Sequence, residues 1–506
     1  MNNIDACIID KVHFINLYNT YQQIVFIRLI MRTVPEDKIK QKLHELNPHW
    51  HLGKIDVDIG RLIKRRYFDL FFPLASQFSV TRAVILMGPR RVGKTVMLQQ
   101  AIQEFIDKGK NPKDIVYIPI DVTVFYTYNL EDLIDFYKQA VGISDIADKI
   151  IIFDEVQSLD GWDRQLKTLV DQFKHTKFIA SGSAAGALKR KSHESGAGRF
   201  VDFMLPPLTF CEYLELLNLT SSLILFNEYG NKATSSKDIN KLNAEFINYL
   251  NYGGFPETIF NQDIRNDPTK FIRESIVDKV IQKDLPSIYG ISNVRELDNF
   301  FHYLIYQTGN EISYQKLCEA SGISKPTIVR YIEFLEAAFL IRVIKRVDEN
   351  GTRMKRNDFL KVYLTNPSMY SALWGLLSND DPDTLGHLVE TAIFSQWVHD
   401  PTWIDRLYYS RFKRGDGEVD MVHLGQDLKI NWCLEVKWSD LHVDRYNSEL
   451  SSLLRFCEKN KIQKAHITTK SIHKNITTNN IELAFREAAL VCFNIGHNLI
   501  YNSNLG

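Results

Sequence analysis

The stretch GPRRVGKT, from Gly88 to Thr95, follows the apolar run Ala83–Met87 and precedes a segment with helical periodicity, Val96–Ile106. Its two glycines, Gly88 and Gly93, let the backbone curl so that successive N–H groups point inward. The helix that follows adds the positive end of its dipole to the same point. A strand, a glycine-rich loop and a helix in this order predict a phosphate-binding loop at the edge of a parallel α/β sheet.

The side chains of this loop supply the charge that a nucleotide needs. Lys94 is expected to reach the outer phosphates, and the Thr95 hydroxyl is the expected Mg²⁺ ligand. Arg90 and Arg91 are expected to hold partner segments rather than phosphate. The predicted nucleotide-binding set is Gly88, Pro89, Arg90, Arg91, Val92, Gly93, Lys94, Thr95 and Val96, together with Asp154. The predicted cofactors are ATP and Mg²⁺.

A second buried strand is predicted at Lys149–Glu155, which reads KIIIFDE and ends in two acids. Asp154 is expected to hold Mg²⁺ through water, and Glu155 to polarise the water that attacks the γ-phosphate. This pair predicts hydrolysis in addition to binding. A third apolar strand, Lys177–Ala180, continues into SGSA at Ser181–Ala184. Its polar groups either sense the γ-phosphate or belong to a plain Ser-Gly turn.

Several motifs, in this order, resemble one family. They are the GPRRVGKT loop, IIFDEVQSLDGW, FIASGSAAGAL, GRF ahead of PPLTFCEY, and YGGFPE at Tyr252–Glu257. The chain is similar to archaeal and bacterial ATPases of the AAA-type superfamily, in which a C-terminal region of uncharacterised function follows the ATPase module. The resemblance extends from about Arg65 to the end of the chain.

This resemblance implies roles for several of these residues. Lys94 and Thr95 would contact nucleotide and metal, Asp154 and Glu155 would take part in catalysis, and Ser181 or Ser183 would be a sensor. Arg199 in GAGRF has the position of the family's GR pair. It would then be an arginine finger or a sensor, with an ordinary salt bridge as the alternative.

Composition limits the architecture and the partners. The chain has 506 residues, of which 45% are hydrophobic, enough for about three or four domains. It has 61 basic and 61 acidic residues, so a nucleic-acid surface would have to be local. The six cysteines are scattered with no CxxC pair, which argues against a zinc site or a disulfide framework. They favour a reducing cytoplasm.

The N-terminal segment, residues 1–60, is predicted to be a helical extension of unassigned role. Met1–Asp10 has no basic cluster ahead of its apolar residues, so no signal peptide is expected. The apolar run Ile24–Met31 is interrupted by Arg28 and is much shorter than the roughly 20 residues that span a bilayer. It predicts an amphipathic helix, with docking to a membrane or partner as the alternative. The predicted location is cytoplasmic, with no membrane partner.

Three further domains are predicted after the extension: an ATPase core at 61–225, a helical lid at 226–298 and a winged helix-turn-helix at 299–370. The last rests on EISYQKLCEASGISKPTIVRYIEFLEAAFLI and two flanking strands. If it binds DNA, its second helix and wing would present Lys325, Thr327, Arg330, Arg353, Lys355 and Arg356 to it. Glu333 and Glu336 lie on that helix and would repel phosphates, so a protein-interaction or packing module is the alternative to DNA binding.

Residues 371–506 are predicted to form a restriction-endonuclease-like, or PD-(D/E)XK, domain. Glu435 and Lys437 flank one valine in LEVKW, so both point to one face of a strand. Asp420 ends GEVD, and Glu390 lies on a preceding helix. Glu390, Asp420 and Glu435 would hold Mg²⁺, and Lys437 would orient a water or the scissile phosphate. Surface charges on strands, or a site that binds without cleaving, are the alternatives.

The fold class predicted from these segments is a multidomain α/β protein. It combines a parallel-sheet AAA-type ATPase core, a helical lid, a winged helix and a restriction-endonuclease-like domain. Two functions remain. The first is an ATPase coupled to an Mg²⁺-dependent nuclease acting on DNA, in DNA maintenance or defence. The second is an ATP-driven switch whose C-terminal half binds a protein or nucleic acid without cleavage. DNA, a protein bound by the winged helix, and further copies in a homo-oligomer are the predicted partners.

Overall fold

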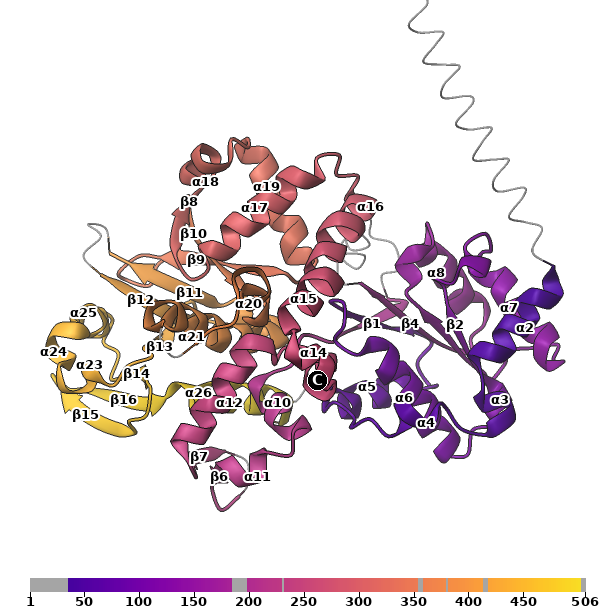
Figure 1. Ribbon diagram of the computed structural model, residues 1–506, viewed down its shortest axis with the longest axis horizontal. Helices are drawn as coiled ribbons and strands as arrows, with labels where there is room; N and C mark the ends of the chain where they lie inside the picture. The colour runs from indigo at the N-terminus through magenta and orange to yellow at the C-terminus, as the bar shows by residue number, and fades with distance from the viewer. Residues whose placement is uncertain are drawn as a thin grey trace, which may run out of the picture.

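Two β-sheets organise the chain, one in each of two lobes (Figure 1). The computed structural model describes residues 35–183, 198–229, 232–353, 358–378, 381–412 and 417–501. The helix predicted at Ile24–Met31 and the wing residues Lys355 and Arg356 lie outside these ranges. Among the helices within the ranges, none is both long and apolar enough to cross a membrane.

The sheet of the first lobe is entirely parallel, with the order β2-β3-β4-β1-β5. Its strands are β1 (Ala83–Gly88), β2 (Ile115–Pro119), β3 (Ile150–Asp154), β4 (Lys177–Ser183) and β5 (Phe200–Met204). The first three are nearly continuous apolar runs, and β4 is buried over its first six residues, as expected of strands covered on both faces. Because the strands are parallel, the loop after β1 and the acids after β3 emerge at the same edge, with β4 between them.

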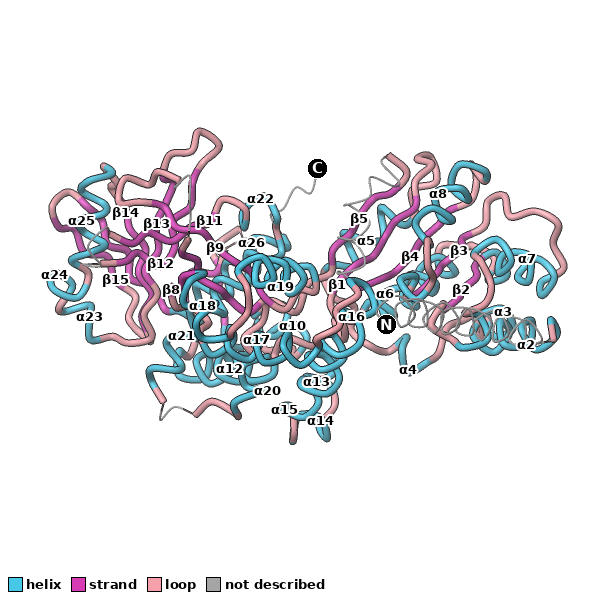
Figure 2. Tube along the Cα trace, turned by 90° about the horizontal axis from the view of Figure 1, so that it is seen from above, coloured by secondary structure: helices cyan, strands magenta, loops and turns pink. Residues whose placement is uncertain are grey.

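Helices cover both faces of this sheet (Figure 2). One face packs against α2 (Glu36–Leu46), α7 (Leu130–Val141) and α8 (Trp162–Gln172). The other packs against α5 (Tyr67–Ala75) and α6 (Lys94–Asp107). The short helices α3 (His49–Leu52) and α4 (Val57–Gly60) connect α2 to α5.

The segment around α2 and α3 belongs to the first lobe, which differs from the separate extension predicted for 1–60. Asn47 exchanges two hydrogen bonds with the backbone of Tyr117, at 2.7 and 3.0 Å. Trp50 donates its indole N–H to the carbonyl of Ile115 at 2.7 Å. Both partners lie on β2, the edge strand, whose outer backbone groups need partners.

The second lobe contains a nine-stranded mixed sheet with the order β15-β16-β14-β13-β12-β11-β9-β10-β8. The strands are β8 (Glu311–Ser313), β9 (Ile341–Val347), β10 (Phe359–Leu364), β11 (Leu407–Arg411), β12 (Glu418–Leu424), β13 (Ile430–Glu435), β14 (Lys464–Thr469), β15 (Lys474–Thr478) and β16 (Ile481–Glu487). Strand β9 pairs with β10 on one side and, in parallel, with β11 on the other. The segments predicted as separate domains at 299–370 and 371–506 therefore share one sheet.

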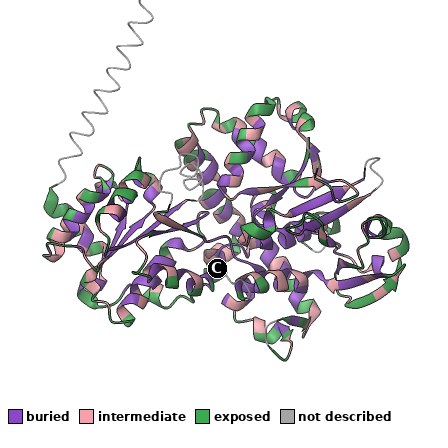
Figure 3. Ribbon diagram, turned by 180° about the vertical axis from the view of Figure 1, so that it is seen from behind, coloured by how far each residue is buried: buried purple, intermediate pink, exposed green. Residues whose placement is uncertain are grey.

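Helices surround this second sheet. Before and between β8 and β9 lie α17 (Val294–Tyr306), α18 (Tyr314–Ser321) and α19 (Lys325–Ala337). The others that follow in the chain are α20 (Ser368–Trp374), α21 (Pro382–Gln396), α22 (Pro401–Ile404), α23 (Leu441–Asp444), α24 (Tyr446–Glu449), α25 (Ser451–Asn460) and α26 (Ala488–Tyr501). Figure 3 shows the buried residues concentrated on the two sheets and on the helices facing them.

Part of the predicted lid packs into the second lobe instead of over the nucleotide loop. Helix α12 (Ile239–Tyr252) of the predicted lid, together with α10 (Phe210–Leu216) from the end of the predicted core, shares an apolar core with α21 and α26. A small hairpin of β6 (Ile224–Phe226) and β7 (Ala233–Ser236) follows α11 (Thr220–Leu223) beside them. The physical reason is the aromatic face of α12, where Phe246 packs against both Phe210 and Trp438 of the second lobe.

A run of short helices joins the two lobes (Figure 1). It comprises α13 (Pro256–Phe260), α14 (Gln262–Asn266), α15 (Pro268–Ile272), two π-helical turns at Arg273–Val277 and Val280–Asp284, and α16 (Leu285–Tyr289). Ile276 and Ile281 of this run belong to the same apolar core as Leu98 of α6 and Phe300 of α17. We call residues 256–284 the connecting segment.

Candidate nucleotide site and a buried charge cluster

The loop between β1 and α6 has the backbone that its glycines predict. A Cβ atom on Gly88 would meet the carbonyl oxygen of Leu205 at 2.2 Å, so a side chain does not fit there. Gly93 has φ of +95°, a conformation that L residues rarely adopt. Lys94 is buried and donates to the carbonyls of Gly88 at 3.0 Å and Pro89 at 2.9 Å. The lysine thus stabilises the curl of the loop.

Asp154, at the end of β3, is the centre of a hydrogen-bond network. It is 2% exposed and accepts from the Thr95 hydroxyl at 2.8 Å, the Tyr117 phenol at 2.7 Å and the Ser181 hydroxyl. Burial and the Asp154 charge raise the pKa of Tyr117 far above its usual range, so the phenol stays a donor. The Thr95 hydroxyl and the Asp154 carboxylate are hard oxygen ligands of the kind that Mg²⁺ takes.

Glu155 is held in a left-handed conformation, with φ of +55°. Its N–H donates to Asp154 Oδ1 and to Ser181 Oγ, both at 3.1 Å. Its carboxylate accepts from the side-chain amide of Gln157, whose oxygen accepts the N–H of Ser183 at 3.1 Å. A non-glycine residue in this conformation carries backbone strain, which the surrounding contacts of Glu155 offset.

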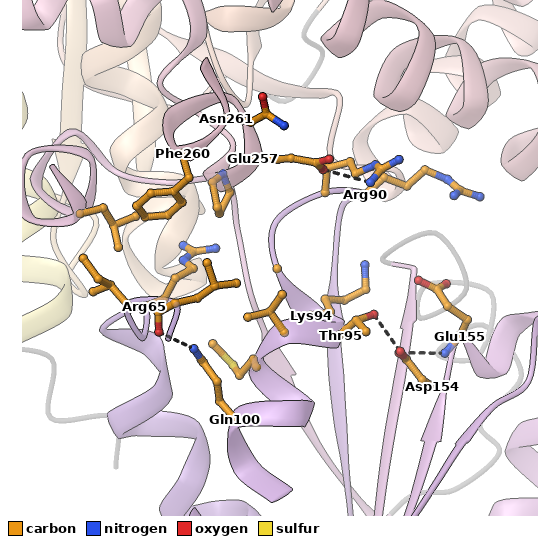
Figure 4. A pocket seen from close by; sticks show the side chains of 18 of the residues that line it. Arg65, Arg90, Lys94, Thr95, Gln100, Asp154, Glu155, Glu257, Phe260 and Asn261 are labelled. Atoms are coloured by element: carbon orange, nitrogen blue, oxygen red, sulfur yellow. Dashed lines mark hydrogen bonds and ion pairs between the residues drawn. The ribbon is translucent and has the colours of Figure 1, made fainter. Parts of the chain in front are cut away.

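Lys94, Thr95, Tyr117, Asp154 and Glu155 line a cavity of about 880 Å³ (Figure 4). Residues of the connecting segment line it as well, so the cavity lies between the ATPase sheet and that segment. Asp121 is also part of the lining, and burial together with Glu155 and Asp154 raises the pKa of its carboxyl. A volume of this size is within the roughly 300–1,000 Å³ of small-molecule sites.

The two arginines of the loop both contact the connecting segment. Arg90 makes two parallel hydrogen bonds of 2.6 Å to the carboxylate of Asp284, and Arg91 donates to Glu257 at 3.0 Å. Both contacts are made within the chain, to residues of the segment that borders the cavity. Val92 is fully buried, and Val96 lines the cavity from the first turn of α6.

Ser181 lies beside Asp154, whereas Arg199 lies at the end of the sheet opposite the nucleotide loop. Ser181 lies on β4, between β1 and β3, and its hydroxyl is bonded to Asp154. Arg199 precedes β5 and pairs with Asp171 of α8. Its neighbour Phe200 aligns with Ala83, the first residue of β1, whereas the nucleotide loop follows the last. At about 3.3 Å per residue, the whole length of β1 separates Arg199 from the nucleotide loop of the same chain. This distance contradicts a sensor role for Arg199 at that loop.

The second predicted site brings its residues together. Strands β12 and β13 are antiparallel neighbours, and Asp420 Oδ2 accepts the N–H of Val436 at 2.8 Å. Lys437 donates to Glu435 Oε1 at 2.8 Å. Glu390 faces the same cluster from α21. All three carboxylates are buried.

Lys361 of β10 lies at the centre of these carboxylates. Its ammonium is 3.2 Å from Glu390, 3.8 Å from Asp420 and in contact with Glu418. Tyr363, two residues further along β10, donates to Glu390. Glu390, Glu418, Asp420, Glu435, Lys361 and Lys437 are called the charge cluster below.

Burial dominates the ionisation of the charge cluster. It raises the pKa of Glu390 to about 7, against the opposing effect of Lys361. It also raises the pKa of Glu435 to about 7, with Asp420 adding to the shift. Burial alone would lower the pKa of Lys437, but Glu435 and Asp420 outweigh it and raise that pKa. Glu435 Oε2 is buried without a hydrogen-bond partner among the described residues.

The fold and the first site define the class of protein. A glycine-rich loop after one parallel strand, with a buried Asp-Glu pair at the end of another, is the arrangement of a P-loop nucleotide-binding domain. Residues 80–214 match the family model of the AAA domain. Residues 243–380, which include the connecting segment, match a domain of unknown function.

Two uncharacterised proteins are similar in sequence. One, from Methanocaldococcus jannaschii, is 26% identical over 362 residues, 70% of this chain and 74% of that protein. The other, from Haemophilus influenzae, is 26% identical over 275 residues, 53% of this chain and 63% of that protein. Among solved structures, yeast Hsp104 in its casein complex has a TM-score of 0.30 at 13% identity, covering 55% of this chain and 50% of that one. Caenorhabditis elegans PCH-2 has a TM-score of 0.23 at 15% identity, and the match covers 39% of this chain and 53% of that one.

Sequence reasoning missed Tyr117, Gln157, Lys361 and Glu418. A weak signal existed for two of them, since Glu418 alternates with Asp420 on β12 and Lys361 with Tyr363 on β10. Alternation places each pair on one face of a strand. It does not say that β10 and β12 belong to one sheet and bring Lys361 and Glu418 together.

Proposed function

We propose that this ATPase is an ATP-driven switch, in which the nucleotide state of the first lobe is passed to the second lobe through the connecting segment. The observation that carries the proposal is the pairing of both loop arginines with that segment, Arg90 with Asp284 and Arg91 with Glu257. Asp284 ends a π-helical turn that packs against α17. A change in the position of Arg90 would therefore be passed through Asp284 to α17 of the second lobe.

In this switch, the negative charge of the nucleotide changes the contacts of the loop arginines. In this proposal Lys94 and the loop N–H groups hold the β- and γ-phosphates, with Thr95 and Asp154 as the residues that would hold Mg²⁺. When bound, Mg²⁺ neutralises phosphate charge. Glu155 accepts a proton from the attacking water. A γ-phosphate in the cavity competes with Asp284 and Glu257 for the two arginines, and its loss on hydrolysis returns them.

The switch can be tested at Asp284, which contacts Arg90 from outside the cavity. Hydrogen exchange of residues 273–306 should change when ATP is added to the wild-type protein, and Asp284→Asn should remove most of that change because the amide no longer holds Arg90 as an ion pair. Asp278→Asn is the matched control, since Asp278 pairs only weakly with Arg273 at 4.0 Å. An ATP-dependent change that persists in Asp284→Asn contradicts the proposal.

The partner of the second lobe is proposed to be a protein. Helix α17, β8, α18, α19, β9 and β10 follow in the order of a winged helix. On α19, Lys325 is paired with Asp358 at 2.9 Å, and Glu336 accepts the N–H of Val343. Arg353 lies over the ring of Tyr408. These cations already make intramolecular contacts, and acidic residues lie on the same helix. Both features favour a protein as the binding partner over the phosphates of DNA.

A second function is supported by the convergence of Glu390, Asp420, Glu435 and Lys437, the residues of a restriction-endonuclease-like metal site. The fit to a metal ion is poor as the side chains stand, because Lys361 already supplies the cation. Within the described ranges, no three His, Cys, Asp or Glu residues form a group that could hold a metal. We therefore assign no step of cleavage to this cluster.

Cleavage assays separate the two functions. The purified protein would be incubated with linear, circular and single-stranded DNA, with Mg²⁺ or Mn²⁺, and with or without ATP. The switch proposal expects intact DNA in every reaction. Cleavage that disappears in Glu435→Ala would establish the nuclease instead, and its dependence on ATP would show whether nucleotide activates or restrains it.

A further inference from the structure

Large exposed side chains gather at the ends of two helices of the second lobe. Tyr306 is the last residue of α17 and is 62% exposed, and Trp374 is the last residue of α20 and is 50% exposed. Leu376 follows two residues later and is 56% exposed. The two helices are in contact with each other (Figure 1). We call the rings of Tyr306, Tyr370 and Trp374 the aromatic patch.

The aromatic patch is held in a fixed arrangement. The centroid of the Trp374 ring lies 5.8 Å from that of Tyr306 and 6.5 Å from that of Tyr370. The chain just after Trp374 is fixed by the buried amide of Asn251, which accepts the N–H of Leu377 at 2.8 Å and donates to its carbonyl at 3.2 Å. Exposed tryptophan and tyrosine rings are the side chains that contribute most to binding at protein interfaces. Rings already fixed in place lose little freedom when a partner binds.

Acidic charge borders the aromatic patch. Asp381, the exposed N-cap residue of α21, lies near Tyr370: burial raises the pKa of that phenol, and the charge of Asp381 adds to the shift. Hydrogen bonds from Thr384 hold the pKa of Asp381 below its usual value, so this carboxylate stays charged. His302 of α17 packs beside the patch and pairs with Asp298 at 3.9 Å. The patch thus combines electron-rich ring faces with a carboxylate.

Other exposed rings of the chain already have a cation of the same chain over them. Lys110 lies 5.2 Å from the centroid of the Phe78 ring, and Arg66 lies 5.3 Å from that of Tyr501. Within the described ranges, no lysine or arginine lies over any ring of the aromatic patch. A cation from outside the chain therefore complements both the rings and the carboxylate beside them.

We propose that the aromatic patch binds an arginine side chain of a partner protein. The planar guanidinium stacks on the exposed Trp374 ring, and Asp381 supplies the opposite charge. A lysine would keep the charge but lose the stacking. This inference rests on the proposed function, in which the second lobe binds a protein, and it adds the chemistry of that partner. Tyr306 and Trp374 both belong to the matched domain of unknown function, residues 243–380.

The aromatic patch also lies on the path proposed for the switch. Tyr306 ends α17, and the π-helical turn that ends at Asp284 packs against that helix. A movement of α17 with nucleotide state changes the position of Tyr306 beside Trp374. The affinity of the patch for arginine should therefore differ between the ATP-bound and the ATP-free protein.

The test compares peptides that differ only in the charge or shape of the side chain. Fluorescein-labelled peptides of alternating glycine and arginine, lysine or citrulline would be titrated with the full chain, and binding followed by fluorescence anisotropy. Citrulline has nearly the shape of arginine but no charge, so its peptide should bind about tenfold more weakly than the arginine peptide. The lysine peptide should lie between the two.

Variants of the patch assign the binding to its residues. Trp374→Leu should weaken the arginine peptide about fivefold, the factor expected for one cation–π contact, whereas Trp374→Phe should keep most of the affinity. Asp381→Asn should weaken it about twofold to threefold, because asparagine still caps α21 but has no charge. Trp403→Leu is the matched control: Trp403 is 36% exposed in the same lobe, and its ring is stacked on His423.

Three results would overturn the arginine site: equal binding of the citrulline and arginine peptides, unchanged affinity in Trp374→Leu, or an equal loss in Trp403→Leu. Self-association of the wild-type protein in sedimentation, absent in Trp374→Leu, would assign the patch to a second copy of the chain instead. The switch is judged separately, by adding ATP. If Trp374→Leu weakens the peptide but ATP leaves the wild-type affinity unchanged, the arginine site stands and the switch fails at this surface.

Discussion

Glu155→Gln is expected to slow ATP hydrolysis by at least about a hundredfold, because a positioned general base contributes roughly 10²–10⁴ to a rate. The amide keeps the size of the side chain but no longer accepts a proton from the attacking water. ATP binding should change by less than about threefold, since the phosphates are held by the loop and by Lys94. Phosphate release under single-turnover conditions measures the rate, and calorimetry measures binding.

The contacts of Glu155 explain why the effect should be confined to the chemical step. Its backbone is fixed by Asp154 and Ser181, and those bonds come from its N–H, which the substitution retains. Glu131→Gln is a suitable control, because Glu131 is exposed at the start of α7 in the same lobe. Hydrolysis at the wild-type rate in Glu155→Gln would transfer the base role to Asp121, which lines the same cavity.

The residues that could be predicted from sequence are those that follow a buried strand directly. Lys94, Thr95, Asp154 and Glu155 each lie within seven residues of a strand end, and parallel strands deliver their ends to one edge. Tyr117 contacts Asp154 because β2 is the neighbour of β3. Ser181 contacts it because β4 lies between β3 and β1. Strand order is a property of the assembled sheet, so local patterns did not contain it.

In the second lobe, even more of the structure depends on contacts that local sequence patterns do not contain. The helices of the predicted lid and winged helix exist, but their domain boundaries do not coincide with the structure, because β9 pairs with β11 and α12 packs against α21. Each of these contacts joins segments far apart in the chain. Lys361 reaches the carboxylates only through that shared sheet, which is why the acidic residues were predicted without the cation that neutralises them.

Lys361→Met is expected to lower the free energy of unfolding of the second lobe by about 3–5 kcal/mol at pH 8, the usual cost of removing one partner from a buried ion pair. Lys361 is 2% exposed, and methionine fills nearly the same volume without the charge. Glu390, Glu418 and Asp420 would then lose their shared counter-ion. Denaturant unfolding, followed by hydrogen exchange in β10–β12, measures the loss in that lobe.

The cost should be smaller at pH 5 than at pH 8. The pKa of Glu390 is raised to about 7 in the folded protein, from an ordinary value of 4.5, and removing Lys361 should raise it further. A carboxyl with a raised pKa binds more protons in the folded state, so its contribution to stability is greatest below about pH 4.5 and is lost as the pH rises through the folded value. Protonation at pH 5 therefore relieves the repulsion that Lys361→Met creates.

A surface lysine of the same sheet provides the matched control. Lys464 of β14 pairs with Glu482 at 2.9 Å, but the two side chains are 48% and 34% exposed, against 2% for Lys361. Lys464→Met should cost no more than about 1 kcal/mol and show little pH dependence between 5 and 8. Equal effects of the two substitutions would mean that Lys361 is not the counter-ion of the charge cluster. The carboxylates would then be free to take another cation, and the nuclease function would regain its strongest physical support.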